Sequence, residues 1–176
     1  MLAHDQLLGG GGKGLKFVSK TTISSPVALV DILGLDSSKT YRFILSGLVP
    51  AATGSSYLML QLLLGGTTDN YAFGATAGTG NNAGNFGGYY HTQGAEIRPI
   101  GGGNYARFDL IIFDLWTVDG TALVSGIGLG SWVGVQAGVS AFAGRAGVGR
   151  VADGIRILSA TQNLTAGSIT VYEVLK

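Results

Sequence analysis

Hydrophobic and polar residues alternate along most of this chain in short runs that end at turn-forming residues. Alternation with a period of two is typical of β-strands with one buried face, and Gly, Pro, Asn and Asp between the runs indicate turns. The runs predict strands at 15–23, 27–33, 40–48, 57–64, 104–118, 122–139, 153–160 and 168–176. With short strand-like pieces between 67 and 103 this makes about eight or nine strands, and no run has the periodicity of an amphipathic helix. The pattern therefore predicts an all-β fold, as an antiparallel β-sandwich, a jelly roll or a barrel.

Two of these runs are apolar on both faces. In 57–64 one face carries Leu58, Leu60, Leu62 and Leu64, and the other carries Tyr57, Met59, Gln61 and Leu63. In 107–116 one face carries Phe108, Leu110, Ile112, Asp114 and Trp116, and the other carries Asp109, Ile111, Phe113 and Leu115. An antiparallel sheet that faces water normally has a polar outer face. We therefore expect the outer face to be covered, either by segment 67–103 or by another subunit.

The low content of charged residues bears on which of these two, the segment or a subunit, covers the outer face. Only 12% of the residues are charged, which favours a subunit, and closed cyclic assemblies are the usual form of homo-oligomers. We expect a homotrimer. The two aspartates of the long run, Asp109 and Asp114, are expected on opposite faces, each paired with Arg107 or another basic residue.

The chain divides into an N-terminal arm and one domain. We expect residues 1–14 to form a flexible arm that ends in the hinge Gly9–Gly12 and carries Leu2, Leu7 and Leu8. The arm is either a disordered tail or an assembly contact that docks on a neighbouring subunit. Residues 15–176 form a single β-sandwich domain, a size within the usual range, with a long, Gly/Asn/Thr-rich loop excursion at 67–103.

Composition excludes several classes of protein. There are 31 glycines in 176 residues, more than double the average share of about 7%, and glycine is used where a chain turns, bulges or lets another backbone approach. A net charge of +1 and scattered lysines and arginines argue against nucleic-acid binding. No cysteine is present, which rules out disulfides and thiolate chemistry. No signal peptide and no run of about 18 apolar residues are readable, so membrane insertion is not expected.

The chain shows little catalytic chemistry. GGGGKG at 9–14 matches a phosphate-binding pattern only formally, because no strand precedes it and no helix follows it. His4 and His91 are the only histidines, too few for a zinc site without cysteine. We expect no catalytic residue, no metal, no cofactor and no enzymatic activity.

Aromatic residues near the end of segment 67–103 form the best candidate for a binding surface. Tyr89, Tyr90 and His91 follow glycines, with Asn85 and Gln93 nearby. Exposed aromatic rings can stack on sugars while amides bind their hydroxyl groups. The alternative is that the rings only anchor the loop onto the sheet.

Two segments resemble small structural proteins of tailed bacteriophages. TYRFILSGLVPAATGSSYLMLQLLLGG (40–66) is similar to a strand, turn and Leu-rich strand unit of that group, and DGIRILSATQNLTAGSITVYEVLK (153–176) resembles its C-terminal hairpin. The resemblance implies a jelly-roll-like β-sandwich, commonly trimeric, in tail fibres, tail tips or head decorations. It leads us to expect a non-enzymatic virion protein, assembled in the host cytoplasm, with a tail-fibre or receptor-binding role. Its partners would be itself, other virion proteins and a host-cell surface glycan. Capsid decoration and a free carbohydrate-binding module are the alternatives.

Overall fold

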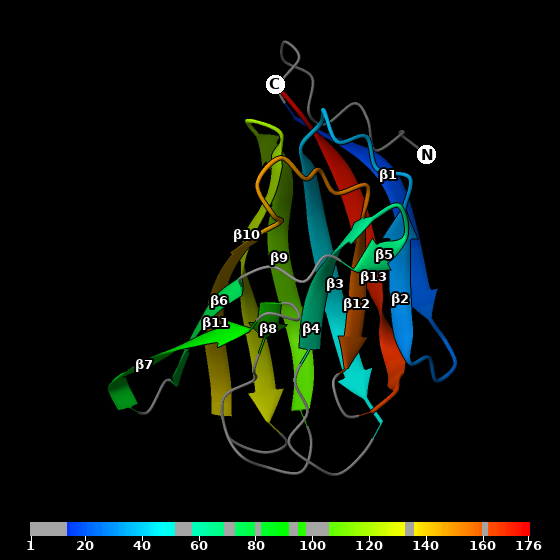
Figure 1. Cartoon of the computed structure of the whole chain (residues 1–176). Helices are drawn as coiled ribbons and strands as arrows, with labels where there is room; N and C mark the ends of the chain where they lie inside the picture. Colours follow the sequence, from blue (N-terminus) through cyan, green and yellow to red (C-terminus); the bar gives the residue numbers. More distant parts are fainter. Residues whose placement is uncertain are drawn as a thin grey trace.

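A computed structural model describes the protein at residues 14–51, 58–68, 73–79, 82–91, 95–97, 106–132, 136–159 and 162–176. In these ranges the chain forms 13 strands in two antiparallel sheets and no helix. Figure 1 shows the smaller sheet against one half of the larger sheet. The predicted all-β sandwich is confirmed.

Eight strands form the larger sheet. Their order is β1 (Gly14–Ile23), β13 (Leu164–Leu175), β3 (Tyr41–Pro50), β9 (Ala106–Val118), β10 (Thr121–Trp132), β11 (Gln136–Arg145), β6 (Phe73–Thr79) and β7 (Asn82–His91). The smaller sheet contains β2 (Leu29–Leu33), β12 (Gly154–Ser159) and β4 (Leu58–Leu64), and β4 pairs on its far edge with both β5 (Thr67–Thr68) and β8 (Ala95–Ile97). Long antiparallel ladders therefore connect parts of the chain that are far apart in sequence.

The connections are those of a jelly roll. The chain passes from β1 in the larger sheet to β2 in the smaller one, then to β3 and back to β4. It later crosses from β8 to β9 and from β12 to β13. The row β1-β13-β3-β9 thus faces the row β2-β12-β4-β8, the eight-strand arrangement of two Greek keys. The other strands are additions to this unit: β10, β11, β6 and β7 widen the larger sheet, and β5 folds back on β4.

The core lies between the two sheets and is filled by alternate residues of each strand. Phe43 of β3 and Phe113 of β9 are paired across the ladder and stack with ring centroids 4.6 Å apart. From the smaller sheet Leu58, Leu60 and Leu62 point into the same buried cluster. The burial of this face fixes the register of each strand, because a shift by one residue would exchange its two faces.

Three sequence expectations need correction. The run 122–139 is not one strand: β10 and β11 are antiparallel partners, from Leu123 opposite Arg145 to Trp132 opposite Gln136. Glycine and serine are frequent in both strands, so the alternation itself does not reveal the turn. The last two strands are not a hairpin either, because β12 pairs with β2 and β4 whereas β13 pairs with β1 and β3. A jelly roll places these strands in different sheets.

The third correction concerns segment 67–103, expected as a loop excursion with only short strand-like pieces. It contains four strands, β5 to β8. Its glycine, alanine and threonine content is typical of loops, but β6 gains a partner on each side, β11 and β7. Backbone pairing with two neighbours outweighs the weak strand propensity of small residues.

Candidate functional site

The outer face of the larger sheet carries a stripe of aliphatic side chains. Ile44 of β3 lies opposite Ile112 of β9, and Ile112 lies opposite Ile127 of β10. In the next row Leu110 lies opposite Leu129. Ile127 is 53% exposed and Leu129 is 40% exposed, so the two outermost members of the stripe are open to solvent. This confirms that the strand around 107–116 is apolar on both faces.

Aromatic residues continue the same face on both sides of the stripe. Trp116 lies opposite Leu123, and both are half-buried. At the edge strand, Phe17 is 55% exposed and contacts the ring of Tyr172 edge to face, with centroids 6.1 Å apart. The larger sheet therefore presents apolar surface across five strands, from β1 to β10.

A bidentate ion pair lies in the middle of this face. Arg42 donates from Nε and Nη2 to the two carboxylate oxygens of Asp114, at 2.8 and 2.7 Å. The two residues are cross-strand neighbours on β3 and β9. Hydrogen bonding to the carboxylate raises the pKa of Arg42. The charge of each group is thus neutralised within the sheet, and the expected pairing of Asp114 with a basic residue is confirmed.

A second ion pair lies near the start of β9. Arg107 Nε lies 2.9 Å from Asp109 Oδ1, as expected for these two residues. The ladder shifts here, because Leu110 pairs with Leu129 but Phe108 pairs with Gly130. This bulge puts Phe108 into the core, 1% exposed, on the same side as Phe113. The expectation that Phe108 shares a face with Leu110 was wrong, since strict alternation does not continue through a bulge.

The smaller sheet repeats this arrangement on its own outer face. Arg156 of β12 binds both carboxylate oxygens of Asp31 of β2, at 2.7 and 2.8 Å. The hydrogen bonds to Arg156 lower the pKa of Asp31, more than burial raises it. Leu29 and Leu33 flank the aspartate on β2 and are 40% and 57% exposed. Both outer faces therefore combine an internally neutralised Arg–Asp pair with exposed aliphatic side chains.

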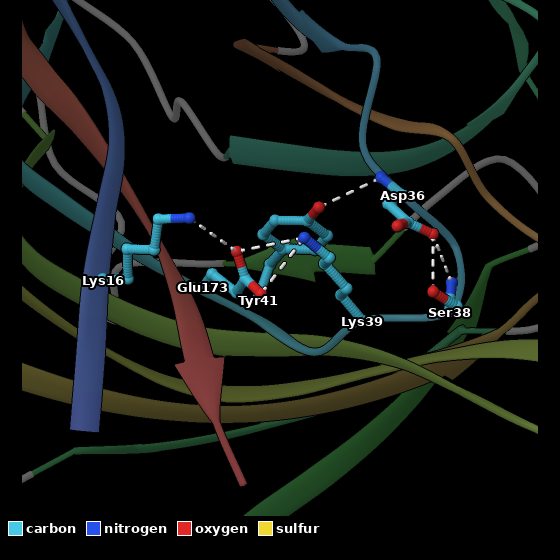
Figure 2. Close-up of polar contacts among 6 residues, drawn as sticks. All are labelled: Lys16, Asp36, Ser38, Lys39, Tyr41 and Glu173. Atoms are coloured by element: carbon cyan, nitrogen blue, oxygen red, sulfur yellow. Dashed lines mark hydrogen bonds and ion pairs between the residues drawn. The ribbon is translucent and has the colours of Figure 1, made fainter. Parts of the chain in front are cut away.

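A polar cluster ties together the end of the sandwich where β1 begins and β13 ends (Figure 2). The Glu173 carboxylate lies 3.2 Å from Lys39 Nζ and 3.8 Å from Lys16 Nζ. The hydrogen bond to Glu173 raises the pKa of Lys39. These contacts join β13 to β1 and, through Lys39, to the turn before β3, so we assign the carboxylate a structural role.

The turn before β3 completes this cluster. The Tyr41 hydroxyl accepts a hydrogen bond from the Asp36 amide at 3.0 Å. The Asp36 carboxylate in turn accepts hydrogen bonds from the Ser38 amide and hydroxyl, which lower its pKa. This is the geometry of an Asx-turn, and it fixes the connection between β2 and β3.

The predicted ligand-contact residues are on a strand at the edge of the larger sheet. Asn85, Tyr89, Tyr90 and His91 belong to β7, which pairs with β6. Gln93 of this set and the arm residues Leu2, Leu7 and Leu8 lie outside the described residues. Ligand contact by the aromatic group stays a prediction.

In the described ranges no group of three or more His, Asp or Glu side chains is placed to hold a metal ion. No helix there is long and apolar enough to cross a membrane.

Comparison with known proteins finds no match among family models, curated proteins or solved structures. The feature of the described residues that bears most directly on function is the apolar outer face of the larger sheet.

Proposed function

We propose that this protein is a non-enzymatic structural component of a bacteriophage virion, a homotrimer that serves in the tail fibre or tail tip. The observation that carries the proposal is the outer face of the larger sheet. It is apolar at Ile44, Ile112 and Ile127, and its central charges are paired within the sheet. Such a surface favours contact with protein over contact with water.

Jelly rolls are a common architecture of viral structural proteins, which agrees with the resemblance of 40–66 and 153–176 to tailed-phage proteins. Fold alone does not define function, so the exposed face adds an independent argument. A building block needs surfaces that remain unsatisfied in the isolated chain. Ile127 and Leu129 belong to such a surface.

The proposed partners follow the arrangement of the chain. Copies of the chain would meet at the sheet, and the arm with Leu2, Leu7 and Leu8 would bind another virion protein. A receptor contact, such as a host-cell glycan, would involve β7, which lies at the outer edge of the widened sheet.

Two measurements test this proposal. Light scattering on the purified chain at micromolar concentration should give three times the 18.0 kDa chain mass, and a monomer would refute the trimer. Gold-labelled antibody against the chain should decorate the tail tip of the purified phage. Labelling of the head would assign the protein to capsid decoration, and a particle without label would refute a virion role.

A further inference from the structure

We infer that copies of this chain contact each other through the outer face of the larger sheet, centred on the row Ile44, Ile112 and Ile127. The inference rests on the proposed function and makes it specific, because it names the surface of the self-contact. The alternatives that the experiment below has to exclude include the outer face of the smaller sheet, which also combines an Arg–Asp pair with exposed aliphatic side chains.

The row of isoleucines has the composition of the centre of a protein interface. Its three isoleucines are cross-strand neighbours on β3, β9 and β10, so they form a continuous ridge. Beyond Ile127 the row continues to Ala141 of β11, which is exposed. Small side chains there leave room for the side chains of a partner. An apolar patch of this kind is typical of the fully buried centre of an interface.

The charge distribution agrees with a second copy as the partner. In a trimer the residues nearest the threefold axis lie close to their own copies, so an unpaired charge there would repel its equivalents. Arg42 is bound by Asp114, and Arg107 is bound by Asp109. Among the described residues of β3, β9 and β10, the charged side chains of this face are therefore neutralised before any partner arrives.

Positive charge lies at the margins of the face. Lys20 on the edge strand β1 and Arg145 at the end of β11 are both exposed. A foreign partner selected by charge would need acidic groups at these margins. An apolar self-contact needs only that the margins stay in solvent, as the rim of an interface does.

The two outer faces provide a matched experiment. I127K/L129K places two lysines on the inferred contact, where the side chains are 53% and 40% exposed. L29K/L33K places two lysines on the smaller sheet, where the side chains are 40% and 57% exposed. Light scattering should give the single 18.0 kDa chain mass for I127K/L129K and the wild-type oligomer mass for L29K/L33K. Circular dichroism confirms that both variants are folded.

Several results would overturn the inference. If I127K/L129K stays trimeric, or if only L29K/L33K dissociates, the contact lies elsewhere, although the trimer and its virion role stand. If wild type is monomeric, both the surface and the trimer fail. If deletion of residues 1–14 alone gives monomers while I127K/L129K stays assembled, the arm and not the sheet holds the copies together.

A labelling measurement covers the case in which the lysine variant does not fold. The chain has no cysteine, so A141C and V148C each introduce a single thiol, the first on the inferred contact and the second in the exposed connection after β11. A maleimide should label V148C at the same rate at all protein concentrations. It should label A141C at least tenfold more slowly in the assembled protein than after dilution to monomer. Equal rates for both thiols in the assembled protein would refute a contact at this face.

Discussion

A glycine in the middle of β10 provides a sharp test of how the larger sheet packs. Gly126 lies between two phenylalanines, opposite Phe113 on β9 and opposite Phe142 on β11. The two rings meet edge to face with centroids 5.9 Å apart. A Cβ at position 126 would collide with the Phe113 Cβ and the Ile112 carbonyl oxygen, and would lie 2.7 Å from the Phe113 Cα. Glycine is therefore required here by close approach.

The cost of Gly126→Ala follows from which atoms are in the way. Overpacking a core costs about 1–3 kcal/mol, and the lower values need a flexible side chain that can move aside. Here two of the three nearest atoms belong to the β9 backbone, so relief requires the separation of two paired strands. We expect a loss of about 3 kcal/mol, which lowers the melting temperature by about 6–12 °C in a chain of this length.

Thermal unfolding followed by circular dichroism, at one protein concentration, measures this effect. Gly14→Ala is the control, because no atom lies within 4 Å of a Cβ built there, and it should melt within about 2 °C of wild type. A Gly126→Ala protein that melts with wild type would refute the close packing of β9 and β10 at Phe113. A large loss in the control would show that the loss at Gly126 does not require a collision, because the lower entropy of the unfolded chain alone makes an unstrained glycine-to-alanine change stabilising.

Three further predictions address charge, ligand contact and assembly. Pairing with Arg156 lowers the pKa of Asp31 on folding, so the contribution of this pair to the free energy of unfolding is present above the unfolded pKa of about 3.9 and is lost as pH falls through the lower folded value. Urea unfolding measured against pH should therefore show a smaller loss of stability at acid pH for Asp31→Asn than for wild type. An equal loss in both proteins would contradict this. Tyr89→Ala with Tyr90→Ala should weaken host-cell adsorption without changing the melting temperature if the rings contact a receptor; a lowered melting temperature would assign them to packing. Deletion of residues 1–14 should leave the β-domain folded by circular dichroism but abolish incorporation into particles, and normal incorporation would make the arm a simple tail.

The sequence predicts which residues share a face of a strand better than it predicts which residues of different strands lie side by side. A period of two assigned Phe43, Phe113, Leu58 and Leu60 to strands of a sandwich without any knowledge of the neighbours. It could not assign Arg42 to Asp114, because 72 residues separate them. It also failed at Phe108, where a bulge inverts the alternation. Local periodicity is a property of one strand, whereas pairing and bulges depend on two.

Glycine-rich strands were the main source of error for the fold. β6 and β7 contain small residues that a local analysis assigns to loops, and β10 and β11 read as one run. In the sheet, glycine has a packing role that depends on the neighbouring strands. Gly126 accommodates two phenylalanines that are 13 and 16 positions away in the chain, counting from 126 to 113 and to 142. Only the assembled ladder reveals that requirement.

The inferred contact surface and the core are specified by one register. The alternation that buries Phe43 and Phe113 between the sheets places Ile44 and Ile112 on the opposite face. A shift of β9 by one residue would bury Asp114 and expose Phe113, so selection for the core also maintains the outer row. In an isolated domain an apolar residue on the outer face would not stabilise the fold more than a polar residue, because that face is exposed to water. Three isoleucines in one cross-strand row, beside an arginine and an aspartate that neutralise each other, are thus best explained by a second surface that the same sheet has to bury.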